Sequence, residues 1–249
     1  MTVYANIGDT HAPYQDKRAI ELACLILEEV KPDVVVHHAD DIDFYALSSF
    51  CRDPARVTKL QEELNSAFRM NKRLTSATPE SLWRLLNDGN HEARLWRYLC
   101  AHPEIAGLDA LSLENLLRLE ELGWELVPPI TEMDNTLAFT HGEAVSKHAA
   151  YDVKKDLENV WFQQSIVRAH SHRTSCYTIR GPNSSRAGYV IGCLCTLTPE
   201  YRAHPNWLQG MAITTVNHGK FDTFSVENLI FSGTDRSRRV IFRGKEFVA

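Results

Sequence analysis

The chain begins with apolar runs separated by polar turns. Residues 2–7 form a strand-like run, residues 17–30 carry apolar positions at three- and four-residue spacing, and residues 33–38 include a continuous β-branched run. These patterns predict a strand, an amphipathic helix and a strand buried on both faces. Strand, helix and buried strand in this order are typical of a layered α/β fold.

The rest of the first half stays mixed, and the second half is mostly β. Helical periodicity predicts helices at 45–76, 92–102 and 111–122, the last closed by Gly123, with a strand at 79–87. After these, a single helix is expected around 151–159 among short strands, which we place at 124–129, 135–142, 164–172, 175–180, 186–197 and 211–226. The locally basic tail at 235–247 predicts a final hairpin with a solvated edge rather than a nucleic-acid grip.

Composition narrows the class of protein. A length of 249 residues with 44% hydrophobic and 24% charged residues suits one domain, which we expect to span 1–249. The net charge of -5 does not favour sequence-independent binding to long nucleic acid and fits small anionic substrates better. We expect a soluble, cytoplasmic protein, because no signal-like or membrane-spanning apolar run occurs. Six cysteines without paired spacing are expected to be reduced and mostly buried.

Polar turns follow five of the strand-like runs, and these turns carry the candidate chemistry. In open α/β sheets ligands bind at the carboxyl ends of strands, so five such ends could form one dense site. One such turn alone is more often a solvated turn or a structural histidine, but five in one chain favour a site. The five turns are Gly8-Asp9-Thr10-His11, Ala39-Asp40-Asp41-Ile42-Asp43, Gly89-Asn90-His91-Glu92, Thr140-His141-Gly142 and His170-Ser171-His172.

The residue types in these turns indicate metal ions. Carboxylates, imidazoles and one amide, with no cysteine among them, suit a pair of ions such as manganese, iron or zinc better than calcium or magnesium. Asp9 and His11 are two residues apart and so point to the same side, as do His170 and His172. We expect two divalent ions, manganese first, with iron, zinc or nickel as alternatives.

The five turns together resemble the motifs of the calcineurin-like metallophosphoesterases: DxH, GDxxD, GNH(D/E), a His-Gly pair and GHxH. The resemblance covers Asp9 to His172. It implies an α/β fold built as a four-layered α/β/β/α sandwich, in which two mixed sheets pack face to face between helices. It also implies hydrolysis of phosphoesters by a hydroxide that bridges two metal ions.

The resemblance assigns roles to individual residues. It places Asp40 between the two ions, makes His91 the group that protonates the leaving oxygen, and makes Asp43 the carboxylate that orients His91. The remaining metal ligands that it implies are Asp9, His11 and His172 for one ion and Asn90, His141 and His170 for the other.

Two residues differ from the family motifs, and three others stand beside the motif residues. Ala39 and Ala169 stand where the family has glycine, and we expect ordinary strand dihedrals and a modest geometric cost. His37 and His38 are interpreted as buried, hydrogen-bonded residues, with support of the metal site as the alternative. Asp41 is interpreted as a polar turn residue.

Substrate contacts are expected beside the motifs. Arg94 and His148 are the candidate substrate-binding residues, although a solvated Arg94 fits the sequence equally well. Further residues that could border the mouth of the site are Lys147, Tyr151, Tyr201, Arg202, His204 and Trp207, the last interpreted mainly as a core residue.

The sequence therefore predicts a dinuclear-metal phosphoesterase acting on a phosphomonoester or phosphodiester. The expected partner is a small phosphoester or a short nucleic acid, without a membrane, and the oligomeric state stays open. The alternatives are a nuclease of the same family acting on DNA ends or single strands, and a noncatalytic scaffold of the same fold.

Overall fold

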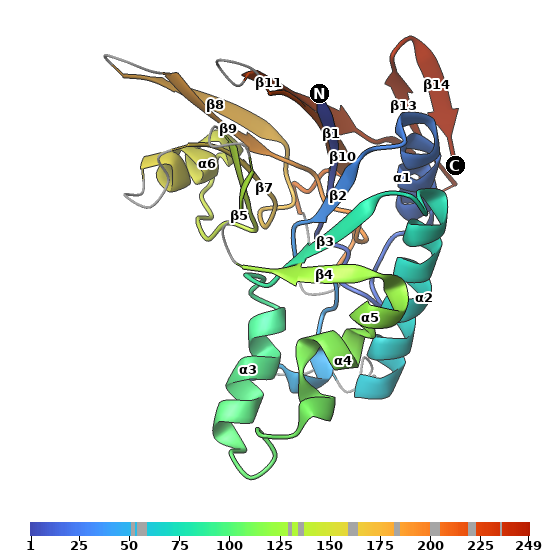
Figure 1. Cartoon of the computed structure of the whole chain (residues 1–249), viewed down its shortest axis with the longest axis vertical. Coiled ribbons are helices and arrows are strands. Elements are labelled where there is room, and N and C mark those ends of the chain that lie inside the picture. Colours follow the sequence, from blue (N-terminus) through green and yellow to red (C-terminus); the bar gives the residue numbers. More distant parts are fainter. Residues whose placement is uncertain are drawn as a thin grey trace.

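The computed structural model describes residues 1–50, 53, 59–128, 131–133, 137–158, 164–181, 185–199, 205–218, 223–234 and 236–249. Within these residues, two large sheets form the centre of the molecule (Figure 1). The first sheet is parallel over β1 to β4, and β10 and β11 extend it antiparallel from β1. Its order is β11 (Thr223–Ile230), β10 (Gly210–Asn217), β1 (Thr2–Ile7), β2 (Val34–His37), β3 (Leu82–Leu86) and β4 (Trp124–Val127).

The second sheet is also mixed. Its inner strands β6, β7 and β9 are parallel, and β5 and β8 pair antiparallel at the two edges. Its order is β5 (Thr131–Met133), β6 (Leu137–Thr140), β7 (Ser165–Arg168), β9 (Ser185–Val190) and β8 (Ser175–Arg180).

Alternating side chains bind the two sheets to each other and to the helices. In β1, Tyr4 faces the core between the sheets, while Ala5 and Ile7 face the helices α1 (Lys17–Val30) and α2 (Leu60–Ala77). In β6, Leu137 and Phe139 enter the core between the sheets, and Ala138 packs against α6 (Ala149–Glu158) on the outer face. The layers are thus helix, sheet, sheet and helix, and the predicted four-layered α/β sandwich is confirmed.

Several element boundaries differ from the expectation. The predicted helix at 45–76 begins only at Leu60 and is preceded by the short η1 (Tyr45–Leu47); residues 51–52 and 54–58 lie outside the described residues. The predicted helix at 111–122 is divided into two short helices, α4 (Leu113–Leu117) and α5 (Leu119–Leu122). The short η3 (Asp109–Leu111) precedes them. Arg118 separates α4 from α5 because it adopts a left-handed conformation with φ 58°.

The tail forms the predicted hairpin from β13 (Ser237–Phe242) and β14 (Lys245–Val248), to which β12 (Ser232–Thr234) adds a third strand. Its apolar side is buried against α1 through Phe242 and Phe247. No helix among the described residues is long and apolar enough to span a bilayer.

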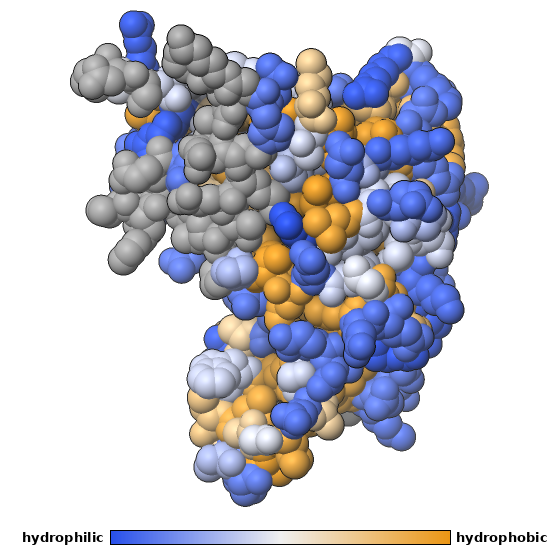
Figure 2. Space-filling view, in the orientation of Figure 1, coloured by the Kyte–Doolittle hydropathy of each residue, from blue (hydrophilic) through white to orange (hydrophobic). Residues whose placement is uncertain are grey.

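A hollow of about 680 Å³ lies between α3 (Glu92–Ala101) and the segment 106–114. Orange, apolar side chains gather over α3 and α4 at the lower end of the molecule (Figure 2), where Trp96 is 69% exposed. The hollow is lined mainly by apolar residues, among them Leu95, Leu99 and Leu111. Within the part of the chain that the structure describes, the groups of residues that could hold a metal ion lie outside this lining.

Candidate metal centre

The polar turns meet at the carboxyl ends of the parallel strands of both sheets. Asp9 and His11 follow β1, Asp40 follows β2, and Asn90 and His91 follow β3. Those strands are neighbours in the first sheet, so their ends lie at one edge. The second sheet adds the residues after β6 and β7, which are His141, His170 and His172. All seven ligands implied by the resemblance therefore lie in one cluster, in which five are buried, His170 is part-buried and Asn90 is exposed.

One half of the cluster joins the ends of β1 and β7. Nε2 of His11 lies 3.0 Å from Nε2 of His172 and 3.7 Å from Oδ2 of Asp40. Oδ1 of Asp9 lies 3.7 Å from Nε2 of His172. These four groups correspond to the predicted site of the first ion.

The other half joins the ends of β3, β6 and β7. Nε2 of His141 lies 3.0 Å from Nδ1 of His170 and 3.2 Å from Oδ1 of Asn90. It also lies 3.4 Å from Oδ2 of Asp40. The same carboxylate oxygen of Asp40 therefore contacts both halves of the cluster, as expected of a bridging ligand.

The donor set fits divalent cations. Two ligands at right angles on an ion about 2.1 Å away lie about 3.0 Å apart, which is the spacing of the His11 and His172 nitrogens. Within the described residues, the buried Oδ1 of Asp9 and Nδ1 of His11 have no hydrogen-bond partner. Such atoms are costly unless a cation or another group compensates them.

The protonation states of His170 and His172 also favour cation binding. Burial lowers the pKa of His170 and of His172 to about 3, so both rings are neutral and available as ligands at pH 7. Burial raises the pKa of Asp9 to about 7. Burial alone would lower the pKa of His141, but Asp40 and Asp9 raise it to about 10. A cation that binds here therefore displaces a proton from His141.

Backbone strain is concentrated in the cluster. Ten described residues other than glycine have positive φ, and six of them belong to these turns. Left-handed backbone is costly for residues with a side chain, and such strain is typical of functional sites. The six residues are Asp9, His11, Ala39, Asp40, His170 and His172.

Ala39 corrects one expectation from the sequence. Its φ is 62°, so the expectation of ordinary strand dihedrals is wrong for Ala39, whereas Ala169 does not have positive φ. Facing glycines accommodate both methyl groups. A Cβ placed on Gly89 would lie 2.9 Å from Cβ of Ala39, and one placed on Gly8 would lie 3.3 Å from Cβ of Ala169.

Glu92 holds the turn that carries Asp40. Its buried carboxylate accepts hydrogen bonds from the amides of Asp40 at 3.0 Å and of Asp41 at 2.8 Å. Asp41 was interpreted as a polar turn residue, and this is wrong because its side chain is fully buried. Asn71 donates to the Asp41 carboxylate at 2.9 Å, and burial raises the pKa of Asp41 to about 7.

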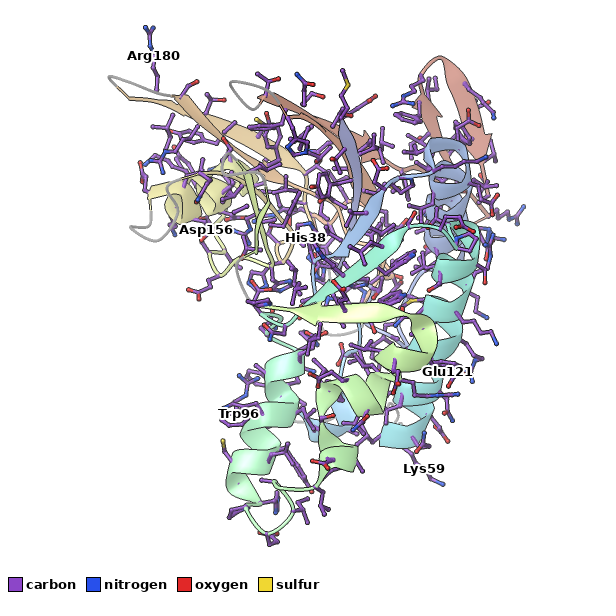
Figure 3. All side chains as sticks on the ribbon, viewed as in Figure 1. His38, Lys59, Trp96, Glu121, Asp156 and Arg180 are labelled. Atoms are coloured by element: carbon purple, nitrogen blue, oxygen red, sulfur yellow. The ribbon has the colours of Figure 1, made fainter. Side chains whose placement is uncertain are left out.

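His37 and His38 are buried and hydrogen-bonded, as predicted. Nδ1 of His38 bonds the carbonyl of Thr140 at 2.9 Å, and its Nε2 bonds Oδ1 of Asn6 at 3.0 Å. His38 thereby joins the first sheet to β6 in the middle of the molecule (Figure 3). Nε2 of His37 lies 3.3 Å from the Thr10 hydroxyl. Neither ring is among the ligand pairs of the cluster.

His91, Asp43 and Arg94 form a unit beside Asp40. Nδ1 of His91 lies 2.9 Å from the carbonyl oxygen of Asp43 and 3.4 Å from its carboxylate. Nη1 of Arg94 donates to the same carbonyl and to Oδ1 of Asp43, both at 2.8 Å. Arg94 is thus neither free nor solvated, because it holds Asp43 in place, and its Nη2 lies 3.4 Å from Nε2 of His91.

Two buried arginines bracket the turn that carries His170 and His172. Before the turn, Arg168 donates to the Asp156 carboxylate at 2.5 Å and to the Ala144 carbonyl at 3.0 Å. After the turn, Arg173 donates to Asp152 and to the carbonyls of Ser146 and Lys147. Asp152 and Asp156 both belong to α6, so this helix anchors both ends of the turn.

The predicted outer contacts have different locations. His148 is exposed before α6, with its ring 5.7 Å from that of Tyr151, and Lys147 is exposed beside it. Trp207 is part-buried and lies next to the cluster, its ring 4.3 Å from that of His172. Tyr201, Arg202 and His204 lie outside the described residues.

Several groups that support the cluster were not predicted from the sequence. Glu92 belongs to the GNHE motif, so a search for carboxylates within the motifs could have found it. Cys195, Arg168 and Arg173 carried no such signal, because their contacts depend on how the chain packs. Cys195 in particular lies with His11 and His172 in a group that could hold a metal ion.

Two phage proteins are similar to this chain over most of its length. No family model matches the chain. The chain is 24% identical over 234 residues to the Gene 54 protein of Mycobacterium phage D29, covering 86% of this chain and 89% of that protein. It is 22% identical over 227 residues to the Gene 54 protein of Mycobacterium phage L5, covering 85% and 88%.

Similar solved structures include two Vps29 proteins. Vacuolar Protein Sorting 29 from Cryptosporidium parvum matches with a TM-score of 0.45 and 11% identity, covering 100% of this chain and 95% of that one. Vps29 from Chaetomium thermophilum matches with a TM-score of 0.43 and 12% identity, covering 92% and 98%. Likeness at this level does not assign a function, which has to come from the residues of the site.

Proposed function

We propose that this protein is a metal-dependent phosphoester hydrolase of the calcineurin-like metallophosphoesterase superfamily, in one domain spanning 1–249. The observation that carries the proposal is the position of Asp40. Its Oδ2 lies 3.7 Å from Nε2 of His11 and 3.4 Å from Nε2 of His141. Each of these two rings meets a second histidine at 3.0 Å, so two ligand groups share one carboxylate.

The ligands that would hold the two ions are those named in the two halves of the cluster. When bound, such ions supply positive charge against phosphate oxygens and lower the pKa of a coordinated water. Histidine and carboxylate donors together favour manganese, iron, zinc or nickel over calcium. The proposed substrate is a small phosphomonoester or phosphodiester.

His91 is the proposed general acid. Its Nδ1 lies 2.9 Å from the Asp43 carbonyl oxygen, which can accept that N–H and fix the ring. Nε2 then lies on the side of the metal cluster, 4.0 Å from Oδ2 of Asp40, where it can give a proton to a leaving oxygen. Arg94 holds Asp43 and lies beside His91, so we propose that it positions this unit and contributes positive charge to the substrate side.

The test measures bound metal and turnover together. We expect the wild type to bind two ions and to hydrolyse p-nitrophenyl phosphate or its bis ester when manganese is supplied. His91→Ala should keep both ions and lose about a hundredfold or more in turnover. Asp40→Asn should lose metal, because it removes the shared ligand charge.

Matched controls separate these roles from general damage. His102→Ala changes an exposed histidine that pairs with Glu104, and it should leave metal binding and turnover unchanged. A metal-loaded wild type without turnover on any phosphoester would contradict the hydrolase proposal. In that case a noncatalytic role of the same fold would become the better interpretation, whereas turnover confined to single-stranded DNA would favour a nuclease.

A further inference from the structure

Cys195 lies at the edge of the metal cluster although the motifs contain no cysteine. Its Sγ is 3.7 Å from Nδ1 of His172, and its side chain is only 2% exposed. The opposite ring nitrogen of His172, Nε2, points at Nε2 of His11 and at Oδ1 of Asp9. The ring therefore has the metal-binding groups on one side and the thiol on the other.

The same arrangement recurs at another histidine of the cluster. Nε2 of His141 points at Asn90 and His170, and its Nδ1 lies 2.7 Å from the carbonyl oxygen of His38. A histidine that binds a metal through one nitrogen carries the proton on the other, and it usually donates this proton to an acceptor that fixes the ring. For His141 the acceptor is a carbonyl, and for His172 the atom in that position is sulfur.

The backbone around Cys195 is held firmly. The amide of Leu194 donates to the carbonyl of Asp9 at 3.2 Å, and Gln209 donates to the carbonyl of Cys195 at 2.8 Å. Trp207 packs edge-on against the His172 ring at 4.3 Å. His172 thus lies between an aromatic ring, a thiol and the metal-binding groups, and its own φ of 56° is strained.

We propose that Cys195 is a positioning residue of the metal centre, whose Sγ accepts the Nδ1 proton of His172 and so directs Nε2 to the ion held with Asp9 and His11. The inference rests on the proposed function, since it concerns the same centre. In this role Cys195 supports the ion without binding it, although its Sγ lies close enough to His11 and His172 to be a ligand. Nδ1 of His172, which faces the sulfur, is the ring nitrogen opposite the one that faces His11 and Asp9.

Cys24 provides a matched control. It is also fully buried, but its Sγ donates to the Arg73 carbonyl at 3.9 Å and does not contact the cluster. Manganese titration by calorimetry should show that Cys195→Ala weakens one of the two ions by about 10- to 100-fold and leaves the other unchanged. Cys24→Ala should retain both affinities, and Cys195→Ser, which restores an acceptor, should recover part of the loss.

Two further measurements keep the outcomes distinct. In the metal-free proteins, nitrogen-15 spectra of the histidine rings should show His172 protonated at Nδ1 in the wild type and a mixture of tautomers in Cys195→Ala. In the cobalt-loaded wild type, a sulfur-to-cobalt charge-transfer band that Cys195→Ser abolishes would make the thiol a ligand and overturn the proposal.

Unchanged affinity for both ions in Cys195→Ala would also overturn it, while leaving the proposed function intact. A wild type that binds no ion would contradict the proposed function. The tautomer measurement would then still decide whether Cys195 fixes His172.

Discussion

The Arg168 guanidinium donates to the Asp156 carboxylate at 2.5 Å inside the protein, two residues before the metal-facing His170. The pair joins β7 to α6, and Arg168 also donates to the carbonyls of Ala144 and Ala169. Gly142 makes room for it, since a Cβ there would lie 2.3 Å from Nε of Arg168. A strained turn is thus held by a buried charge.

Breaking this ion pair should be costly. Asp156→Asn leaves the Arg168 charge buried without its counter-ion, and we expect a loss of about 3–5 kcal/mol in the free energy of unfolding, measured in urea. Lys154→Ala breaks the exposed pair with Glu158 on the same helix and should have little effect. Equal effects of the two substitutions would contradict the role assigned to the buried pair.

Substitutions at Gly89 and at Ala39 should differ in their effect on stability. Gly89→Ala places a Cβ 1.8 Å from Oε2 of Glu92 and 2.8 Å from Oδ1 of Asp40, so it should cost about 2 kcal/mol or more and weaken metal binding. Ala39→Gly removes a buried methyl group but relieves left-handed strain, so its net effect should stay within about 1 kcal/mol. Urea unfolding and metal titration of both variants test this contrast.

Metal binding should stabilise the fold. Manganese at a hundred times its dissociation constant should raise the free energy of unfolding by about 2.7 kcal/mol, and a chelator should remove the gain. His91→Ala should keep the gain, because His91 is not among the proposed ligands, whereas Asp40→Asn should lose it. Thermal unfolding with and without manganese measures the difference, and an equal gain in Asp40→Asn would exclude the bridging role.

Asp16 should make stability depend on pH. It caps α1 through the amides of Arg18 and Ala19 and accepts hydrogen bonds from Gln209 and Arg238, which ties the C-terminal hairpin to the core. Burial raises the pKa of Asp16, but the hydrogen bond from Gln209 and the other donors outweigh it and leave the pKa below its ordinary value of 3.8. Asp16→Ala should cost about 2–4 kcal/mol at neutral pH.

The contribution of Asp16 to stability should decline on acidification. The unfolded chain takes up the Asp16 proton at a higher pH than the folded protein, so the contribution is complete well above pH 3.8 and declines as the pH falls through the lower folded pKa. Urea unfolding between pH 6 and 3 should therefore show the difference between wild type and Asp16→Asn shrinking below about pH 4. A difference that grows on acidification would refute the assignment.

Much of the fold was accessible from local pattern. The strand-like run of β1, the periodic helix at 17–30 and the β-branched run of β2 predicted a layered α/β fold, because strand, helix and buried strand in this order are typical of one. The spacing in Asp9-Thr10-His11 and His170-Ser171-His172 put the paired side chains on one side. The helix at 17–30 was predicted with its observed bounds, since its apolar stripe lies on a single face.

Packing between distant segments decided the backbone conformation and the buried contacts around the site. Spacing along the chain did not reveal that Ala39 takes φ 62° or that Asp41 is buried, because both depend on Glu92 and Asn71 from other elements. The contact of Cys195 with His172 and the anchoring of Arg168 by α6 depend likewise on how the second sheet meets the first. The sequence by itself determined which residues end the strands, and the tertiary structure decided which buried groups hold them in place, since those contacts join segments that local periodicity cannot relate.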